Sequence, residues 1–461
     1  MYEIDLEKLK IQFKFVDGKK LELHTGSYMP LFPYTTHEID YDIEEIIGTV
    51  LCLIDGKKPI GKGFDSLFSQ MSKDIMLLEA NPDLKEELKR TLYKLYFNKD
   101  KNNLRPLNFR FIEQNFKDTD KNKVAVFLSD VLADKEQLRS CIDSAVLKGG
   151  SNVLESFVLS KLDMVSLQEQ PRRHYKRVVE FLTPLFNKDF AFVVSSPEHI
   201  RDYIGLLFDF YYFMYVSQSY LQLVRFTEGE RNNVYPLYFC LEWEKTSSVR
   251  DCCDKGWRTL SNMTKYLFPH AATLEVLNAM GEIDEDVYCY DYIDLGEMVS
   301  SSEITDIEIS EKIVFITNEL KKASQLSLDD IVLNHSERGL TADAVRYLFD
   351  TMNAIAYCPS RKRAGKGYGD NFKNIYSKFI KYRGRLGNIL NISEEMLIFL
   401  TKLAINNNKK MRLNDVFKEF EKRGVFFDDA SKDCIASYYE KLNLIDKKSD
   451  SGDSKYVRRI I

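Results

Sequence analysis

The sequence SEEMLIFLTKLAINNNKKMRLNDVFKEFEKRGVFFDDASKDCIASYYEKLNLIDKKSDSGDSKYV, residues 393–457, is the stretch that indicates most clearly how this chain folds. Apolar residues recur there at helical spacing in three separate runs. Ser393 precedes the first run and is followed by two glutamates, which is the pattern of a capped helix start. The second run begins near Asn414 and stops at Gly424, so it predicts a second short helix.

A third helix is predicted from about Ser431 to Asn443, where the helical spacing stops. Two short β-prone pieces then flank a polar turn at 449–454, as in a β-hairpin. Three short helices followed by a hairpin is the order of a winged helix. We therefore predict a winged-helix domain at 391–461.

The charges of this predicted domain leave its partner open. The third helix would enter the DNA major groove, but its lysines, Lys432 and Lys441, are matched by Asp433 and Glu440. The predicted wing is more basic, and its candidate DNA contacts are Lys447, Lys448 and Lys455. Winged helices also serve as protein docking modules, so DNA contact and protein docking both stay open.

Residues 361–385, just before this domain, form a basic island. They contain nine basic side chains and one acid, Asp370, in a chain whose net charge is −5. A predicted helix precedes the island, with Thr341 as its cap and Pro359 at its end. A local excess of positive charge in an acidic protein indicates an anionic partner more than a solvated face.

Three glycines in the island, Gly365, Gly367 and Gly369, predict a loop whose backbone can approach a phosphate closely. Arginine side chains beside it offer forked donors that suit phosphate oxygens. We predict that the island clamps a nucleic-acid backbone; the alternative is a solvated loop. Its candidate DNA contacts are Arg361, Lys362, Arg363, Lys366, Lys373, Lys381, Arg383 and Arg385.

The composition is that of an ordinary globular protein. Of 461 residues, 44% are apolar and 29% are charged, which suits about three domains. The net charge excludes a uniformly basic coat protein. We predict a mainly α multidomain fold with a small N-terminal β element and the C-terminal winged helix. The predicted divisions are a mixed β and loop segment at 1–64 with a hairpin-type turn at Asp55-Gly56, a helical core at 65–330, a helix with the basic segment at 331–390, and the winged helix at 391–461.

No metal, cofactor or membrane segment is predicted. The eight cysteines include no CxxC pair, and the six histidines are scattered. Reduced thiols in a cytoplasmic protein are therefore expected. Tyr203–Val216 is the most hydrophobic stretch, but it is shorter than a membrane span and contains Asp209. We predict that it forms a helix buried in the core.

Known enzyme signatures are absent from the sequence. It lacks a phosphate-loop motif, HExxH and GxSxG. Glu242-Trp-Glu-Lys245 resembles the acid-and-lysine end of a nuclease core in the wrong register, and an edge-strand charge pair is the alternative. We predict no catalytic residue. Twelve acids from Glu275 to Glu311, with no Lys or Arg among them, predict either a surface for a basic partner or a solvated acidic loop.

A resemblance to a known family rests on five segments: Phe13–Lys20, Thr25–Pro33, Ala356–Arg363, Arg383–Leu390 and Lys448–Val457. They resemble the DptG family of DNA phosphorothioation-dependent restriction proteins. The resemblance reaches both ends of the chain, and none of its motifs is catalytic.

The resemblance implies a role in bacterial defence, where host DNA carries sulfur in place of a non-bridging phosphate oxygen and unmarked DNA is restricted. It implies an accessory subunit that binds double-stranded DNA and acts with a DptF-like ATPase and a DptH-like helicase. Two alternatives stay open. One is a scaffold that joins the ATPases without touching DNA, and the other is a nuclease with an unrecognised site.

Overall fold

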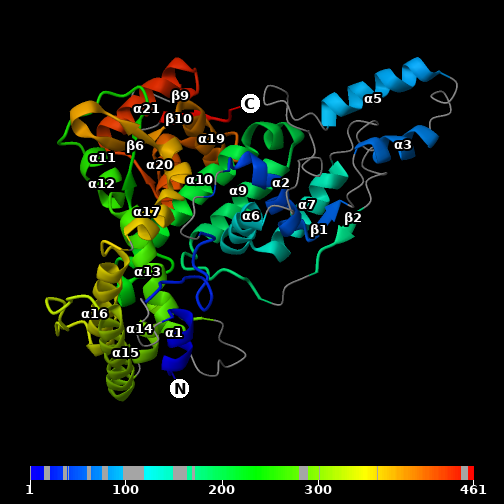
Figure 1. Ribbon diagram of the computed structural model, residues 1–461. Coiled ribbons are helices and arrows are strands. Elements are labelled where there is room, and N and C mark those ends of the chain that lie inside the picture. Colours follow the sequence, from blue (N-terminus) through cyan, green and yellow to red (C-terminus); the bar gives the residue numbers. More distant parts are fainter. Residues whose placement is uncertain are drawn as a thin grey trace.

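The computed structural model describes residues 2–14, 21–34, 39, 41–59, 64–74, 81–96, 119–148, 164–168, 172–279, 289–300, 302–360, 362–447 and 455–460. Within these ranges the chain is mainly helical, and its short strands form small sheets of two or three strands (Figure 1). No helix in the described part has the length and apolar character that crossing a membrane requires.

The N-terminal elements are helices and one pair of short strands. In order they are α1 (Leu6–Gln12), α2 (Glu44–Asp55), β1 (Lys57–Pro59), α3 (Phe64–Asp74), α5 (Pro82–Tyr96), α6 (Thr119–Leu132), α7 (Lys135–Lys148) and β2 (Met164–Ser166). The prediction of a hairpin turn at Asp55-Gly56 is wrong. Gly56 ends α2 in the left-handed conformation, with φ +74°, and its N–H donates to the Cys52 carbonyl at 2.8 Å.

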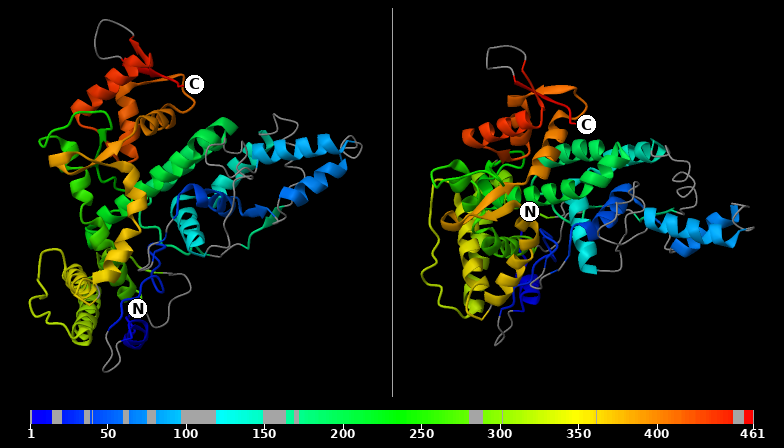
Figure 2. Two further views of the ribbon diagram at one scale, coloured as in Figure 1. Left: turned by 45° about the horizontal axis from the view of Figure 1, so that its top comes forward. Right: turned by 90° about the horizontal axis from the view of Figure 1, so that it is seen from above.

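The β structure observed in residues 1–64 is small, because the chain at Gly56 ends a helix and does not turn between two strands. Within the described ranges it consists of β1, which pairs antiparallel with β2, and an isolated bridge at Ile4. Helices α3 and α5 extend away from the rest of the molecule in every view (Figures 1 and 2).

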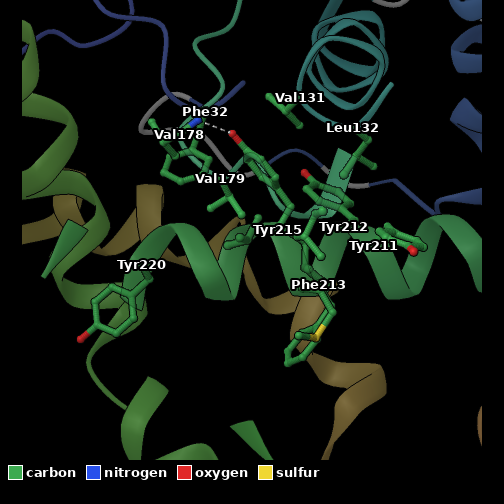
Figure 3. Packing of buried hydrophobic residues seen from close by; sticks show 14 of the residues in the cluster. Phe32, Val131, Leu132, Val178, Val179, Tyr211, Tyr212, Phe213, Tyr215 and Tyr220 are labelled. Carbon is green, nitrogen blue, oxygen red and sulfur yellow. Dashed lines mark hydrogen bonds between the residues drawn. The ribbon is translucent and has the colours of Figure 1, made fainter. Parts of the chain in front are cut away.

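Helix α10 (Pro197–Leu223) runs through the centre of the molecule and packs along α9 (Leu182–Val194) (Figure 1). The prediction that Tyr203–Val216 forms a buried helix is confirmed, because these residues lie in α10 and most are buried. Figure 3 shows Tyr212 and Tyr215 projecting from one side of α10 and Phe213 from the other. The Tyr215 hydroxyl accepts a hydrogen bond from the Val178 N–H at 3.1 Å, so α10 organises the segment that leads into α9.

The elements between α10 and α17 (Lys362–Asp370) are mainly helices, with two short strands among them. They are η2 (Phe226–Glu228), β3 (Leu237–Tyr238), β4 (Cys240–Leu241), α11 (Asp251–Asp254), α12 (Trp257–Leu260), α13 (Met263–Leu277), α14 (Tyr292–Ser300), α15 (Glu303–Ser324) and α16 (Leu340–Ala356). The N-terminus is attached here, since the Asp5 N–H donates to the Ala279 carbonyl at 2.6 Å. The predicted cap of α16 is wrong: Asp306 of α15 accepts from the Leu340 and Thr341 N–H groups at 3.0 and 2.7 Å.

The C-terminal third alternates helices and short strands. It comprises α17 (Lys362–Asp370), α18 (Lys373–Tyr376), η3 (Ser377–Phe379), β5 (Ile380–Tyr382), η4 (Gly384–Leu386), β6 (Asn388–Ile392), α19 (Glu394–Ile405), β7 (Lys410–Arg412), α20 (Leu413–Lys422), β8 (Val425–Phe426), α21 (Asp429–Lys441), β9 (Ile445–Lys447) and β10 (Lys455–Arg458). Ser393 caps α19 as predicted, accepting from the Met396 N–H at 3.1 Å. Helix α21 begins earlier than predicted, because Asp428 is its cap. Strands β7, β10 and β9 form an antiparallel sheet.

The C-terminal helices are joined to the rest of the protein by backbone pairing and by a buried charge. Strand β8 pairs parallel with β3, and β6 pairs parallel with β4. Arg423, at the end of α20, is fully buried and forms two hydrogen bonds with Asp189 of α9, at 2.7 and 2.8 Å. One cluster of buried hydrophobic side chains extends from Tyr2 to Val457 and crosses every predicted division of the chain.

Candidate nucleic-acid interface

The glycines of the basic island lie in helix α17, so the prediction of a glycine-rich loop is wrong. A Cβ atom on Gly369 would lie 2.2 Å from the Thr264 carbonyl oxygen of α13, and one on Gly365 would lie 3.0 Å from the Tyr357 ring. Glycine is required where two backbones approach this closely. Gly369 therefore lets α17 pack against α13, and the three glycines lie in a helix instead of forming a phosphate cradle.

Helix α17 also carries three exposed cations, Lys362, Arg363 and Lys366. We call them the α17 patch. Within the described residues none of the three forms an ion pair or a side-chain hydrogen bond. Tyr357 packs on Gly365 and donates its hydroxyl to the carbonyl of Lys265 on α13 at 2.6 Å.

Other lysines of the island are paired with acids. Lys373 lies 2.5 Å from Asp370. Lys378, which was counted in the island, lies 2.7 Å from Asp209 of α10. Lys381 lies 3.3 Å from Glu242. A cation in such a pair has to give up its partner, or share it, before it can bind a phosphate.

Arg383 has a structural role in the fold. Its guanidinium donates to the carbonyl oxygens of Leu241, Glu242 and Glu244 at 2.8–3.1 Å, and to the Asn391 amide oxygen at 3.1 Å. It therefore connects the β5–β6 turn to the chain after β4. Arg385, on η4, is exposed. Arg361 lies outside the described residues.

The candidate contacts on the predicted wing are only partly available. Lys447 lies on β9, and Lys455 on β10 lies 3.2 Å from Glu440. Lys448 and the turn at 449–454 lie outside the described residues. On α21, Lys432 lies 3.3 Å from Glu421 of α20. Lys432 and Lys455 are thus each engaged by an acid within the protein.

The Glu242 and Glu244 pair does not form a carboxylate site. Glu244 is buried, pairs with Arg250, and accepts hydrogen bonds from the Ser431 hydroxyl at 2.9 Å and the Leu241 N–H at 3.0 Å. Asp428, the cap of α21, shares the same guanidinium. The Arg250 guanidinium, shared by Glu244 and Asp428, therefore holds α21 against the chain after β4. Among the described residues no cluster of His, Cys, Asp and Glu is arranged to hold a metal ion.

All eight cysteines are free thiols, and most are buried. Cys240 and Cys252 belong to a small buried cluster near Arg383. Hydrogen bonding from the Cys240 thiol lowers the pKa of Cys252 to about 6. Both side chains are fully buried, so this acidity is not accompanied by access for a substrate.

Several acids of the 275–311 stretch have internal partners. Glu275 accepts the N–H groups of residues 26–29 at 2.9–3.1 Å. Burial raises its pKa despite these hydrogen bonds. Asp291 and Asp294 pair with Arg231, and Asp306 caps α16. Glu282, Asp284, Glu285 and Asp286 lie outside the described residues.

One basic group was missed by the sequence analysis. Arg172, Arg173, Lys176 and Arg177 come within six positions of each other and line a pocket before α9. The density of basic residues was the available signal. Arg231 and Asp294 also line the pocket, and because they are more than fifty residues away along the chain, the sequence does not indicate the pocket itself.

No protein-family model matches this chain, and no curated protein matches it in sequence.

Proposed function

We propose that this protein is an accessory, DNA-binding subunit of a phosphorothioation-dependent restriction system, acting on DNA that lacks the sulfur mark. The resemblance to the DptG family suggests the system. The observation that carries DNA binding is the α17 patch, where Lys362, Arg363 and Lys366 are exposed and unpaired within the described residues.

The patch suits contact with the DNA backbone rather than with bases. Its charged groups lie at the tips of flexible side chains on an exposed helix face. Such groups neutralise phosphates without reading the base sequence. Because these cations have no acidic partner in the described part of the chain, they can bind phosphates without breaking an ion pair there. We expect affinity that depends strongly on salt and little on sequence.

The C-terminal unit is proposed to be a winged helix used mainly for docking. Helices α19, α20 and α21 followed by the hairpin β9–β10 have the expected order, and β7 adds the third strand. Lys432 of α21 and Lys455 and Arg458 of the wing are each paired with an acid within the protein. This favours a structural or protein-binding role over insertion into the major groove.

The same proposal includes partners that hydrolyse ATP, a DptF-like ATPase and a DptH-like helicase, in the cytoplasm. Its support is the resemblance together with the absence of a phosphate-loop motif from the sequence.

A salt titration tests the proposal. Fluorescence anisotropy of labelled duplex DNA measures the binding constant K at several salt concentrations, for wild type and for the triple variant Lys362→Ala, Arg363→Ala, Lys366→Ala. If all three side chains reach phosphates, the slope of log K against log salt becomes shallower by about 2.7, which is three contacts of about 0.9 each. The loss of affinity should be equal for duplexes of unrelated sequence.

A matched control removes the same charge elsewhere. Lys10, Lys123 and Lys322 lie on α1, α6 and α15, and each pairs with an acid three residues earlier. Their triple substitution by Ala should leave the slope unchanged. Wild-type protein that binds no DNA but retains the two ATPases in a pull-down would replace the proposal by the scaffold alternative. Mg²⁺-dependent plasmid nicking that is lost in Glu242→Ala would favour the nuclease alternative.

A further inference from the structure

The segment before α9 and the chain after η2 enclose a pocket of about 670 Å³ with an excess of positive charge. Its lining includes five basic side chains, Arg172, Arg173, Lys176, Arg177 and Arg231, and two carboxylates, Glu180 and Asp294. Volumes of this size are typical of sites that hold small organic ligands.

Two of the five cations form ion pairs with acids in α14 or directly before it. Arg231 pairs with both Asp291 and Asp294, and Lys176 lies 2.8 Å from Asp294. These pairs fix one wall of the pocket. They also hold the Lys176 and Arg231 side chains in place at its edge.

The other three cations have no acidic partner within the described residues. Arg172 and Arg173 are exposed at the pocket. Arg177 donates to the carbonyl oxygens of Asp130 and Ala133, both at 2.9 Å, which satisfies hydrogen bonds without an ion pair. Burial, together with the nearby charge of Arg173, lowers the pKa of Arg177 to about 10. An anion in the pocket would relieve both effects.

Two buried polar atoms of the lining residues also lack partners. Arg177 Nε and Thr183 Oγ1 are inaccessible to solvent and form no hydrogen bond with a described residue. Thr183 lies in the first turn of α9, which has no side-chain cap, so the positive end of the helix dipole adds to the field there. Buried polar groups are normally hydrogen-bonded, and unmet ones at a cationic pocket suit a ligand that accepts hydrogen bonds.

We propose that this pocket binds a small phosphate-bearing ligand, such as a nucleotide or an inorganic oligophosphate. Arginine forks match phosphate oxygens in geometry and charge. The cations converge on one hollow instead of following a line, and two carboxylates are among them, which favours a compact ligand over a nucleic-acid strand. This site is separate from the α17 patch and does not depend on the proposed function.

A second pocket, of about 460 Å³ between α2, α10 and α18, provides a contrast. Its lining has three carboxylates, Asp42, Glu45 and Asp209, against two lysines. Both lysines are paired with these acids. It has no excess charge to attract an anion, so we do not extend the proposal to it.

Isothermal titration calorimetry with inorganic tripolyphosphate and with ATP tests the proposal. Wild type should bind one equivalent of either ligand. The double variant Arg172→Ala, Arg173→Ala alters exposed side chains and should weaken binding by at least about tenfold, since a charge-assisted hydrogen bond contributes about this factor or more. Thr183→Val, which keeps the side-chain shape and removes the unmatched hydroxyl, should weaken binding without loss of folding by circular dichroism.

Two controls separate this site from the proposed DNA interface. The charge-matched variant Lys123→Ala, Lys322→Ala and the triple variant of the α17 patch should both bind tripolyphosphate like wild type. The proposal is overturned if wild type binds neither ligand, or if the control variants lose affinity equally. It is also overturned if duplex DNA binds through Arg172 and Arg173 while tripolyphosphate does not compete.

Discussion

The buried ion pair between Asp189 and Arg423 yields the sharpest test of how the C-terminal helices are held. Both side chains are essentially inaccessible to solvent. Arg423 also donates to the Glu419 carbonyl at 2.7 Å, and the Tyr211 hydroxyl donates to Asp189 at 2.6 Å. The substitution Asp189→Asn keeps the shape of the side chain and removes its charge, which leaves the Arg423 guanidinium buried without its main counter-ion.

The expected loss of stability is large. Removing one member of a buried ion pair costs about 3–5 kcal/mol, because the remaining charge stays desolvated. Replacing both members by neutral groups, as in Asp189→Asn with Arg423→Met, should cost clearly less than the sum of the two single changes. The surface pair of Arg201 and Asp202, at 2.7 Å, supplies the control. Asp202→Asn should cost at most about 1 kcal/mol.

The measurement is urea unfolding followed by the fluorescence of Trp243, whose ring lies 4.9 Å from that of Tyr438 in α21. Trp257 is the other tryptophan of the chain, so a Trp257→Phe background makes the signal specific to the C-terminal unit. If Asp189→Asn shifts the transition no further than Asp202→Asn does, the pair does not hold this unit and the reasoning fails.

Two further predictions concern acid stability and helix packing. Burial lowers the pKa of His270 to about 3, so below pH 6.5 the unfolded chain binds a proton that the folded protein does not. Stability should therefore fall by about 2 kcal/mol between pH 7 and pH 5 from this residue, and urea titrations of His270→Phe should lack that component. Gly369→Ala should lower the melting temperature by forcing α17 away from the Thr264 backbone, 2.2 Å from the added Cβ, and by more than Gly365→Ala, whose Cβ would meet the Tyr357 side chain at 3.0 Å; equal effects would contradict the packing argument.

The parts of the fold that the sequence predicts correctly have local causes. The Ser393 hydroxyl caps α19 within its own first turn. Gly424 follows α20 with φ +86°, a conformation that glycine adopts without strain. In each case the residue acts on backbone groups within a few positions of itself, so spacing along the chain is sufficient evidence.

The incorrect predictions depend on contacts between distant residues. Gly369 in α17 is explained by the approach of Thr264, about a hundred positions earlier in the chain. The cap of α16 comes from Asp306, not from the adjacent Thr341. Glycine and threonine have several structural uses, and only the tertiary neighbours decide between them. The pocket before α9 could not be predicted for the same reason, because its lining includes Arg231 and Asp294, which are distant in sequence.

Charge density along the sequence is also an incomplete guide to an interface. The nine cations of 361–385 look equivalent in sequence, but the fold gives several of them partners from far away. Asp209 pairs with Lys378, and Glu242 pairs with Lys381. A phosphate that bound either lysine would have to compete with a carboxylate already in place. The α17 patch has no such competitor among the described residues, so its binding free energy is not reduced by an internal rearrangement. The salt slope measures this difference directly, because a cation released from a carboxylate contributes less net counter-ion displacement than one that starts unpaired. Substituting the paired Lys378 or Lys381 should therefore flatten the slope less than substituting Lys362 or Lys366.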